Sequence, residues 1–201
     1  MTAPGSTNSG GEAANSNGAA NSGGEPDRPD EPGTTSTLDD RAFRSVMARF
    51  ATGVTVMTTV DAAGEPSGMT ANAVTSVSLD PLQVLVCVGR RTDMATRVTS
   101  GRRFALSMLP ADGEAVSNHF ADPDRSRGWG AFGDVAVTTA STGCPILASA
   151  IGWVDCTVAA IHDGGDHLIV VGAVVAAGTN GDEDALGYFK HGYVRIAGPI
   201  D

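Results

Sequence analysis

The residues from Gly68 to Ser78 carry the strongest chemical signal in the sequence, because they are small and rich in hydroxyl and amide groups. The polar members are Thr70, Asn72, Thr75, Ser76 and Ser78. Small neighbours leave the backbone open to close approach, and the polar side chains offer hydrogen bonds. This is the chemistry needed to hold a flat ligand with polar edges and a phosphate tail.

A second polar segment, Gly89–Asp93, follows the apolar run Gln83–Val88. The run is rich in β-branched residues and predicts a strand buried on both faces. Arg90 and Arg91, with the hydroxyl of Thr92 and the amides of a helix start, could bind an anion in this acidic chain. A solvated charged loop explains the same residues equally well.

The third segment runs from His162 to His167 and contains Asp-Gly and Gly-Asp dipeptides between two strand-like runs. Such dipeptides are typical of a hairpin turn. Two histidines and two aspartates could also suggest a metal site, but no further cluster of ligands appears, so we predict no metal. A single histidine that faces a pocket from a strand end fits better, because it can donate to a carboxamide or a phosphate.

The fourth segment, Leu186–Arg195, gathers aromatic residues in a chain that is only 5% aromatic. Most such clusters pack in a core or an interface. Tyr188, Phe189, Lys190 and His191 could also line a pocket, where the two basic side chains would meet phosphate and the rings would pack on a base.

Composition excludes several classes of function. The formal net charge of −10 argues against a nucleic-acid surface and against docking on anionic membranes. The sequence contains no phosphate-binding P-loop, no dinucleotide-binding Gly-x-Gly-x-x-Gly turn and no Gly-x-Ser-x-Gly nucleophile elbow. Three cysteines without a Cys-x-x-Cys pair favour a reducing, cytoplasmic setting, and no apolar stretch approaches the length of a membrane span.

Hydrophobic patterning divides the chain in two. Residues 2–37 contain no large apolar residue, so we predict a disordered tail over 1–37 and a folded domain over 38–201. Leu38, Phe43, Val46, Met47 and Phe50 recur at helical spacing, and Thr37 can cap this helix.

The rest of the domain favours strands over helices. Strands are predicted at Val54–Val60, Pro66–Ala71, Val74–Ser78, Val84–Val88, Phe104–Leu109, Val135–Thr139, Trp153–His162, His167–Ala176 and Tyr193–Ile196. Short helices fit Met94–Ser100 and Gly113–Phe120. This number of strands, with short turns and few helices, predicts a mainly β, antiparallel barrel.

The ordered set of motifs resembles the flavin reductase family with the FMN-binding split β-barrel fold. Phe43–Thr59 looks like the opening of that family, and Gly68–Pro81 looks like its flavin loop. Ser100-Gly101, the Gly165–His167 loop and Tyr188–Lys190 follow in the family's order. The resemblance spans roughly Leu38 to Ile196 and implies an antiparallel, Greek-key-like split barrel with a few short helices.

The resemblance also implies an activity: NAD(P)H-dependent reduction of FMN or FAD in a homodimer, with the reduced flavin passed to a separate monooxygenase. It implies that the cofactors supply the reactivity, with His167 as the one candidate for a catalytic residue. Flavin would be bound by Gly68, Met69, Thr70, Ala71, Asn72, Ala73, Thr75, Ser76, Cys87, Val88, Gly89, Arg90, Arg91 and Thr92. Nicotinamide would be bound by His167, Tyr188, Phe189, Lys190 and His191.

One departure concerns the phosphate end, where Met94 replaces a hydroxyl that is frequent in the family and the Arg90–Arg91 pair would compensate. Two other functions remain as alternatives. The first is a split barrel that holds flavin without oxidising NAD(P)H. The second, an oxidase of the pyridoxamine-phosphate type, would need a second basic cluster, and only 13 lysines and arginines are available.

Overall fold

The computed structural model describes residues 39–198, and the tail predicted over 1–37 lies outside the described residues. Within that range, no helix is both long enough and apolar enough to cross a membrane.

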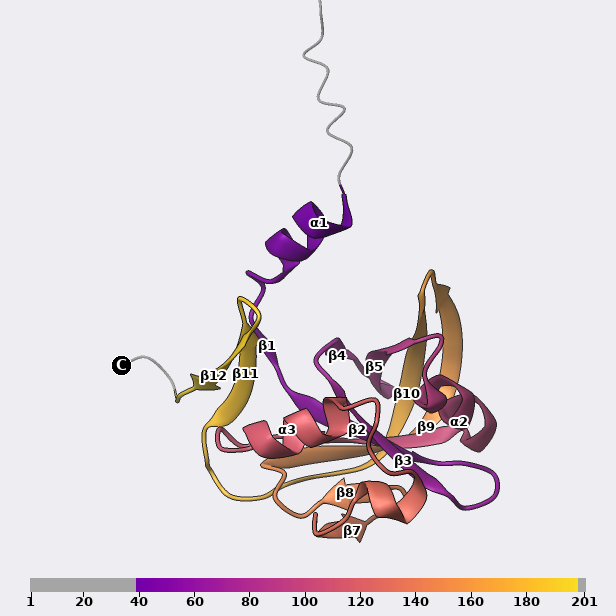
Figure 1. Ribbon diagram of the computed structural model, residues 1–201. Coiled ribbons are helices and arrows are strands. Elements are labelled where there is room, and N and C mark those ends of the chain that lie inside the picture. Colours follow the sequence, from indigo (N-terminus) through magenta and orange to yellow (C-terminus); the bar gives the residue numbers. More distant parts are fainter. Residues whose placement is uncertain (1–38, 199–201) are drawn as a thin grey trace, which may run out of the picture. The chain divides into compact units, whose positions relative to one another are not determined.

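A seven-stranded antiparallel sheet forms the centre of the fold, with strand order β3-β2-β6-β9-β10-β5-β4 (Figure 1). Its strands are β2 (Thr55–Val60), β3 (Pro66–Ala71), β4 (Val74–Leu79), β5 (Leu82–Gly89), β6 (Arg103–Met108), β9 (Gly152–Gly164) and β10 (His167–Thr179). The mainly β, antiparallel architecture predicted from the sequence is therefore confirmed.

Two residues force this sheet to curl. β3 and β4 stand at opposite edges of the sheet, yet only Asn72 and Ala73 join them. Three successive Cα–Cα steps span at most about 11 Å, so the two edges must approach each other. β3 and β5 are indeed in contact, although four strands separate them in the sheet order. The result is a barrel that almost closes at Asn72.

The barrel interior is filled by apolar side chains from β2, β5, β6, β9 and β10 and by one helix, α2 (Asp93–Gly101). Met94, Ala95 and Val98 of this helix are buried in the same cluster. Met94 is only 2% exposed, so its side chain belongs to the core and does not face the loop at the start of α2.

Smaller elements cover the outside of the barrel. The hairpin of β7 (Val137–Thr139) and β8 (Pro145–Leu147) packs on β2 and β6, while α3 (Glu114–Ala121) and the 3₁₀ helix η1 (Gly128–Ala131) contact β3. A three-stranded sheet follows the order β1 (Thr52–Gly53), β11 (Ala185–Phe189), β12 (Gly192–Ile196). α3, η1, β8 and β11 share a second apolar cluster.

Polar side chains inside this fold are paired. All six residues of β2 are buried, and the hydroxyls of its threonines donate to backbone carbonyls, as Thr59 does to Arg103 at 2.6 Å. The buried carboxylate of Asp155 accepts hydrogen bonds from the amide and the hydroxyl of Thr142. Burial raises the pKa of the Cys156 thiol to about 12 and raises that of Cys144 as well.

The structure corrects two details of the sequence analysis and adds a third. Twelve strands are present in the described range, and three of them, β1, β8 and β11, were not predicted. α1 (Asp40–Met47) has Asp39 as its N-cap, whose carboxylate accepts a hydrogen bond from the Ala42 amide at 2.6 Å, whereas Thr37, the predicted cap, lies outside the described residues. Its apolar face is exposed, since no residue of α1 is buried.

Gly172 offers a direct test of the barrel's packing. A Cβ at this position would lie 2.8 Å from Cε1 of Phe104 and 2.9 Å from Cβ of Cys156. We expect Gly172→Ala to lower the free energy of unfolding by about 1–3 kcal/mol, because a well-packed core resists an added carbon. Urea unfolding measures the change. Gly53→Ala, with nothing within 4 Å of its Cβ, is the control, and equal stability of the two variants would contradict this packing.

Candidate functional site

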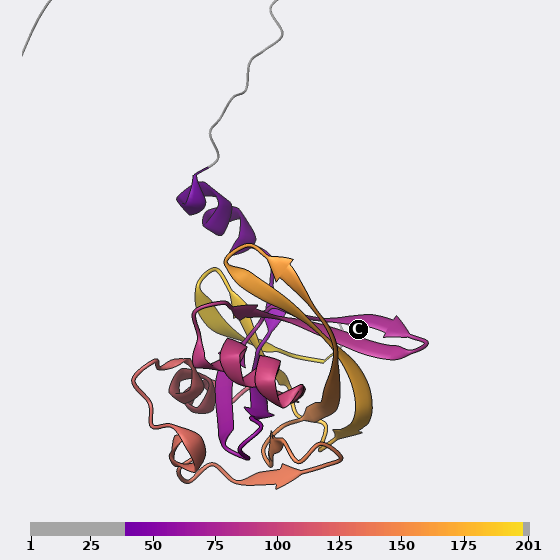
Figure 2. The ribbon, with the colours of Figure 1, turned by 90° about the vertical axis from the view of Figure 1, so that its right-hand side faces the viewer.

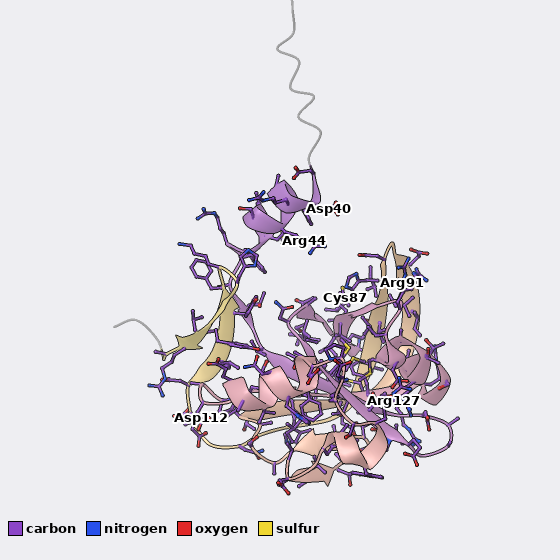
Figure 3. The ribbon with its side chains drawn as sticks, viewed as in Figure 1. Asp40, Arg44, Cys87, Arg91, Asp112 and Arg127 are labelled. Carbon is purple, nitrogen blue, oxygen red and sulfur yellow. The ribbon has the colours of Figure 1, made fainter. Side chains whose placement is uncertain are left out.

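The pairing of β10 with β5 brings two of the sequence-predicted segments together. Gly89 and His167 are direct partners in the antiparallel register, and Cys87 pairs with Ile169. The 163–167 turn therefore lies beside the loop that follows β5. Figure 3 shows Cys87 and Arg91 at this end of the β9–β10 hairpin.

The β3–β4 corner completes this group. The amide of Cys87 donates to the carbonyl of Ala73 at 3.0 Å, and Val74 pairs with Val86. Four residues of the corner are exposed: Asn72, Ala73, Thr75 and Ser76. The structure thus assembles their amide and hydroxyl groups next to the end of β5 and to His167.

The earlier residues of the predicted flavin loop face the protein itself. Gly68 lies against Phe120 of α3, where an added Cβ would be 2.7 Å from Cε1. The hydroxyl of Thr70 donates to the carbonyl of Ser117 at 2.6 Å, while Met69 and Ala71 join the barrel core. Gly68 to Ala71 therefore connect β3 to α3 and to the interior.

The two arginines after β5 differ in their contacts. Arg90 pairs with Asp163 at 2.8 Å, and its Nε donates to the carbonyl of Gly165 at 2.9 Å. The side chain of Arg91 is exposed and makes no hydrogen bond or ion pair with any part of the chain that the structure describes. Arg90 holds the hairpin tip, and Arg91 is available for an anion.

Thr92 is also committed to local structure. Its hydroxyl caps α2 by accepting from the Ala95 amide, and it donates to the carbonyl of Gly89 at 2.8 Å. The cap fixes the helix start immediately after Arg91 and leaves the hydroxyl no free proton for a ligand.

A carboxylate orients His167. Nδ1 of His167 lies 2.7 Å from Oδ1 of Asp166, so this nitrogen carries the donated proton and Nε2 faces away. A Cβ added to Gly89 would lie 4.0 Å from Nε2, which places that nitrogen against the end of β5. The hydrogen bond from His167 is the largest cause that lowers the pKa of Asp166. The sequence analysis gave no role to Asp166.

The aromatic segment reaches this site through β1. Thr52 pairs with Tyr188 in the three-stranded sheet, and its hydroxyl accepts from the side-chain amide of Asn72 at 3.3 Å. Tyr188 packs in the second apolar cluster with Tyr193, the ring centroids lying 5.6 Å apart. Lys190 Nζ lies 5.1 Å from the centroid of Phe189, and Lys190 and His191 form the exposed turn.

The donor set fits a flavin better than a metal ion. Amide, hydroxyl and backbone groups at residues 72–76 suit the polar edge of a flat ring, and Arg91 beside the start of α2 suits a phosphate. Among residues 39–198, no group of three histidine, cysteine or acidic side chains is placed to hold a metal ion. The hairpin interpretation of His162–His167 is confirmed by β9 and β10.

Comparison with known proteins identifies the family to which this chain belongs. The family model described as "Flavin reductase like domain" matches residues 47–197, so the chain belongs to the flavin reductase-like family. The resemblance seen in the sequence is thereby confirmed.

Individual relatives agree with this class. A "Probable flavin reductase" of Rhizobium meliloti (strain 1021) is 42% identical over 170 residues, which are 82% of this chain and 52% of that protein. The chain thus spans about half the length of this curated relative.

Two solved structures share the fold. BorF, the flavin reductase component of a bacterial two-component tryptophan halogenase, matches with a TM-score of 0.75 and 34% identity over 80% of this chain and 100% of its own. The Streptomyces globisporus C-1027 NADH:FAD oxidoreductase SgcE6, in complex with NAD and FAD fragments, matches with a TM-score of 0.74 and 36% identity. That match covers 82% of this chain and 97% of SgcE6.

The contacts of Arg90 lead to a specific expectation. Arg90→Ala removes the ion pair with Asp163 and the hydrogen bond to Gly165, so backbone amides of residues 163–167 should exchange with solvent several-fold faster. Hydrogen–deuterium exchange with mass spectrometry measures this. Arg91→Ala, which breaks no contact in the described chain, is the control and should leave the exchange unchanged. Equal protection in Arg90→Ala and wild type would contradict the role of Arg90.

Proposed function

We propose that the protein is an NAD(P)H-dependent flavin reductase that transfers hydride from nicotinamide to FMN or FAD. The observation that carries this proposal is the β5–β10 register, which sets the Gly89–Arg91 loop beside His167 and next to the exposed donors of the β3–β4 corner. The proposed ring-binding surface and the histidine that would face it are thus held next to the same pair of strands. Membership of the family and the names of its relatives support the same activity.

The flavin is proposed to lie against the exposed part of the predicted set. Asn72, Ala73, Thr75 and Ser76 would meet the ring, the backbone of Cys87 to Gly89 would run alongside it, and Arg91 would hold the phosphate. Gly68 to Ala71 would support the corner from behind, and Arg90 and Thr92 would fix the loop. Met94 contributes no phosphate contact, since it is buried in the core.

The proposed hydride transfer requires no acidic or basic side chain of the protein. A bound flavin accepts hydride from a dihydronicotinamide without a protein nucleophile. The chain's task is to hold both rings in contact and to stabilise negative charge with backbone amides at the corner. His167, whose Nδ1 is held by Asp166, would present Nε2 to the nicotinamide, and Tyr188, Phe189, Lys190 and His191 would bind the rest of the dinucleotide.

The partner is proposed to be a flavin-dependent monooxygenase component that receives the reduced flavin. BorF supports this, because it is the reductase component of a two-component enzyme. A cytoplasmic location is proposed as well, since the three cysteines are free thiols. Residues 38–201 are proposed to carry the activity, with residues 1–37 dispensable for it.

A homodimer is proposed from two uncovered apolar surfaces. Phe43, Val46 and Phe50, in or just after α1, are 52%, 64% and 68% exposed. The β4–β5 hairpin, which extends from the barrel in Figure 2, exposes Leu79 at 84% and Leu82 at 52%. Surfaces of this kind mark protein contacts. A second copy would cover them and would also enclose the exposed donors at residues 72–76.

Steady-state assays test the activity. Oxidation of NADH or NADPH by the full chain should depend on added FMN, FAD or riboflavin, with a kcat of roughly 1–1,000 per second. Arg91→Ala should raise the KM for FMN about tenfold and leave the KM for riboflavin, which has no phosphate, unchanged. Absence of flavin-dependent turnover with either nucleotide would refute the reductase and leave a flavin-binding barrel.

The dimer has its own test. Replacing Leu79 and Leu82 together by Asp places two charges on the proposed interface, so sedimentation should shift from two chains to one. Turnover should fall at the same time if the second copy encloses the flavin surface. Thr138→Asp, at an exposed position of β7, should keep the wild-type mass. A wild-type protein that sediments as a single chain at micromolar concentration would rule out the dimer.

A further inference from the structure

The helix α1 has a polar face that the proposed function does not yet use. Its apolar side chains lie on one side, and the opposite side carries four polar residues at helical spacings of three and four: Asp40, Arg41, Arg44 and Ser45.

A cavity of about 480 Å³ lies against this polar face. It is lined by Asp40, Arg41, Arg44, Ser45 and, from the β11–β12 turn, His191. A hydrogen bond of 2.7 Å from the Lys190 amide to the Ala48 carbonyl joins the turn to the end of the helix. A volume of this size suits a nucleotide-sized group and is far larger than a single ion needs.

The cavity is locally basic in a chain whose net charge is −10. Two arginines and a histidine line it against one carboxylate, and Lys190 adjoins it on the turn. Within residues 39–198, the side chains of Arg41, Arg44 and His191 make no hydrogen bond or ion pair, so their donors are available. An anion is the ligand that such a group of donors would bind.

The turn that carries His191 has an unusual backbone. Lys190 and His191 have φ angles of +50° and +65°, a conformation that residues with side chains rarely adopt. Two consecutive residues of this kind form a tight hairpin turn, where Asn-Gly is the common choice. Here the turn carries two basic side chains instead, and that of His191 lines the cavity.

One electrostatic contribution links α1 with the nicotinamide side of the proposed site. Besides the hydrogen bond from His167, the charge of Arg44 contributes to lowering the pKa of Asp166, so α1 lies within electrostatic range of the 163–167 tip. Tyr188, proposed to bind the dinucleotide, leads directly into the turn through β11.

We propose that the polar face of α1, through Arg41 and Arg44, and the Lys190-His191 turn bind the phosphate groups of the nicotinamide dinucleotide. This inference rests on the proposed reductase function and adds a phosphate-binding site on a helix that the sequence analysis singled out only for its apolar face. The flavin phosphate is proposed to be held separately, at Arg91.

A comparison of two electron donors distinguishes an effect on phosphate binding from an effect on hydride transfer. NADH carries the pyrophosphate, whereas 1-benzyl-1,4-dihydronicotinamide carries no phosphate. In the double variant Arg41→Ala/Arg44→Ala, the ratio of kcat/KM for NADH to kcat/KM for the benzyl compound should fall roughly tenfold or more. The matched control is Arg127→Ala, an exposed arginine that does not line the cavity, and it should keep the wild-type ratio.

A binding measurement gives a readout without turnover. Calorimetric titration with ADP-ribose, which has the phosphates but no nicotinamide, should show a Kd roughly tenfold higher in the double variant than in wild type. The KM for FAD should stay within about twofold. Circular dichroism and the melting temperature show whether the variant is folded, and Arg41→Lys/Arg44→Lys should recover part of the ADP-ribose affinity.

The outcomes distinguish the two proposals. If wild type reduces flavin but the donor ratio and the ADP-ribose Kd are unchanged in the double variant, the phosphate site is wrong and the reductase stands. If the KM for FAD rises in place of the effect on NADH, the cavity serves the flavin, which also overturns the inference. If wild type oxidises neither donor, the reductase itself fails, and loss of ADP-ribose binding still supports the phosphate site.

Discussion

The two-residue link between β3 and β4 is the constraint on which the rest of the structure depends. Asn72 and Ala73 join strands from opposite edges of a seven-stranded sheet, so they fix where the sheet curls and where the barrel closes. The closure point is also where the exposed amide and hydroxyl groups gather. Barrel geometry and the proposed ligand surface are therefore set by the same few residues.

The long hairpin of β9 and β10 then decides what faces that corner. β10 is bonded to β9 on one side and to β5 on the other, so its register places His167 opposite Gly89. A shift of one residue would turn the His167 side chain to the other face of the sheet. Arg90, through Asp163 and Gly165, adds a side-chain lock to a register that the strands already specify.

Local patterning predicted most strands and the hairpin at 162–167, because alternation, β-branched residues and turn dipeptides can be recognised within a few consecutive residues. It missed β1, β8 and β11. Thr52–Gly53 and Pro145–Leu147 are only two and three residues long, and Ala185–Phe189 contains a glycine that close packing against Ile196 requires. The difference in contacts between Arg90 and Arg91 could not be predicted either, because the β9–β10 hairpin is what brings Asp163 next to Arg90. The cationic side of α1 could have been found from helical spacing, had its polar positions been read with its apolar ones.

The buried thiols of the barrel affect how well the protein resists oxidation. A protein that releases reduced flavin in air works beside the hydrogen peroxide that such flavins form with oxygen. Peroxide attacks thiolates, and burial keeps Cys144 and Cys156 protonated at neutral pH because it raises the pKa of both. The packing that completes the core around Asp155 thus also shields two of the three cysteines from the oxidant that the proposed reaction would generate.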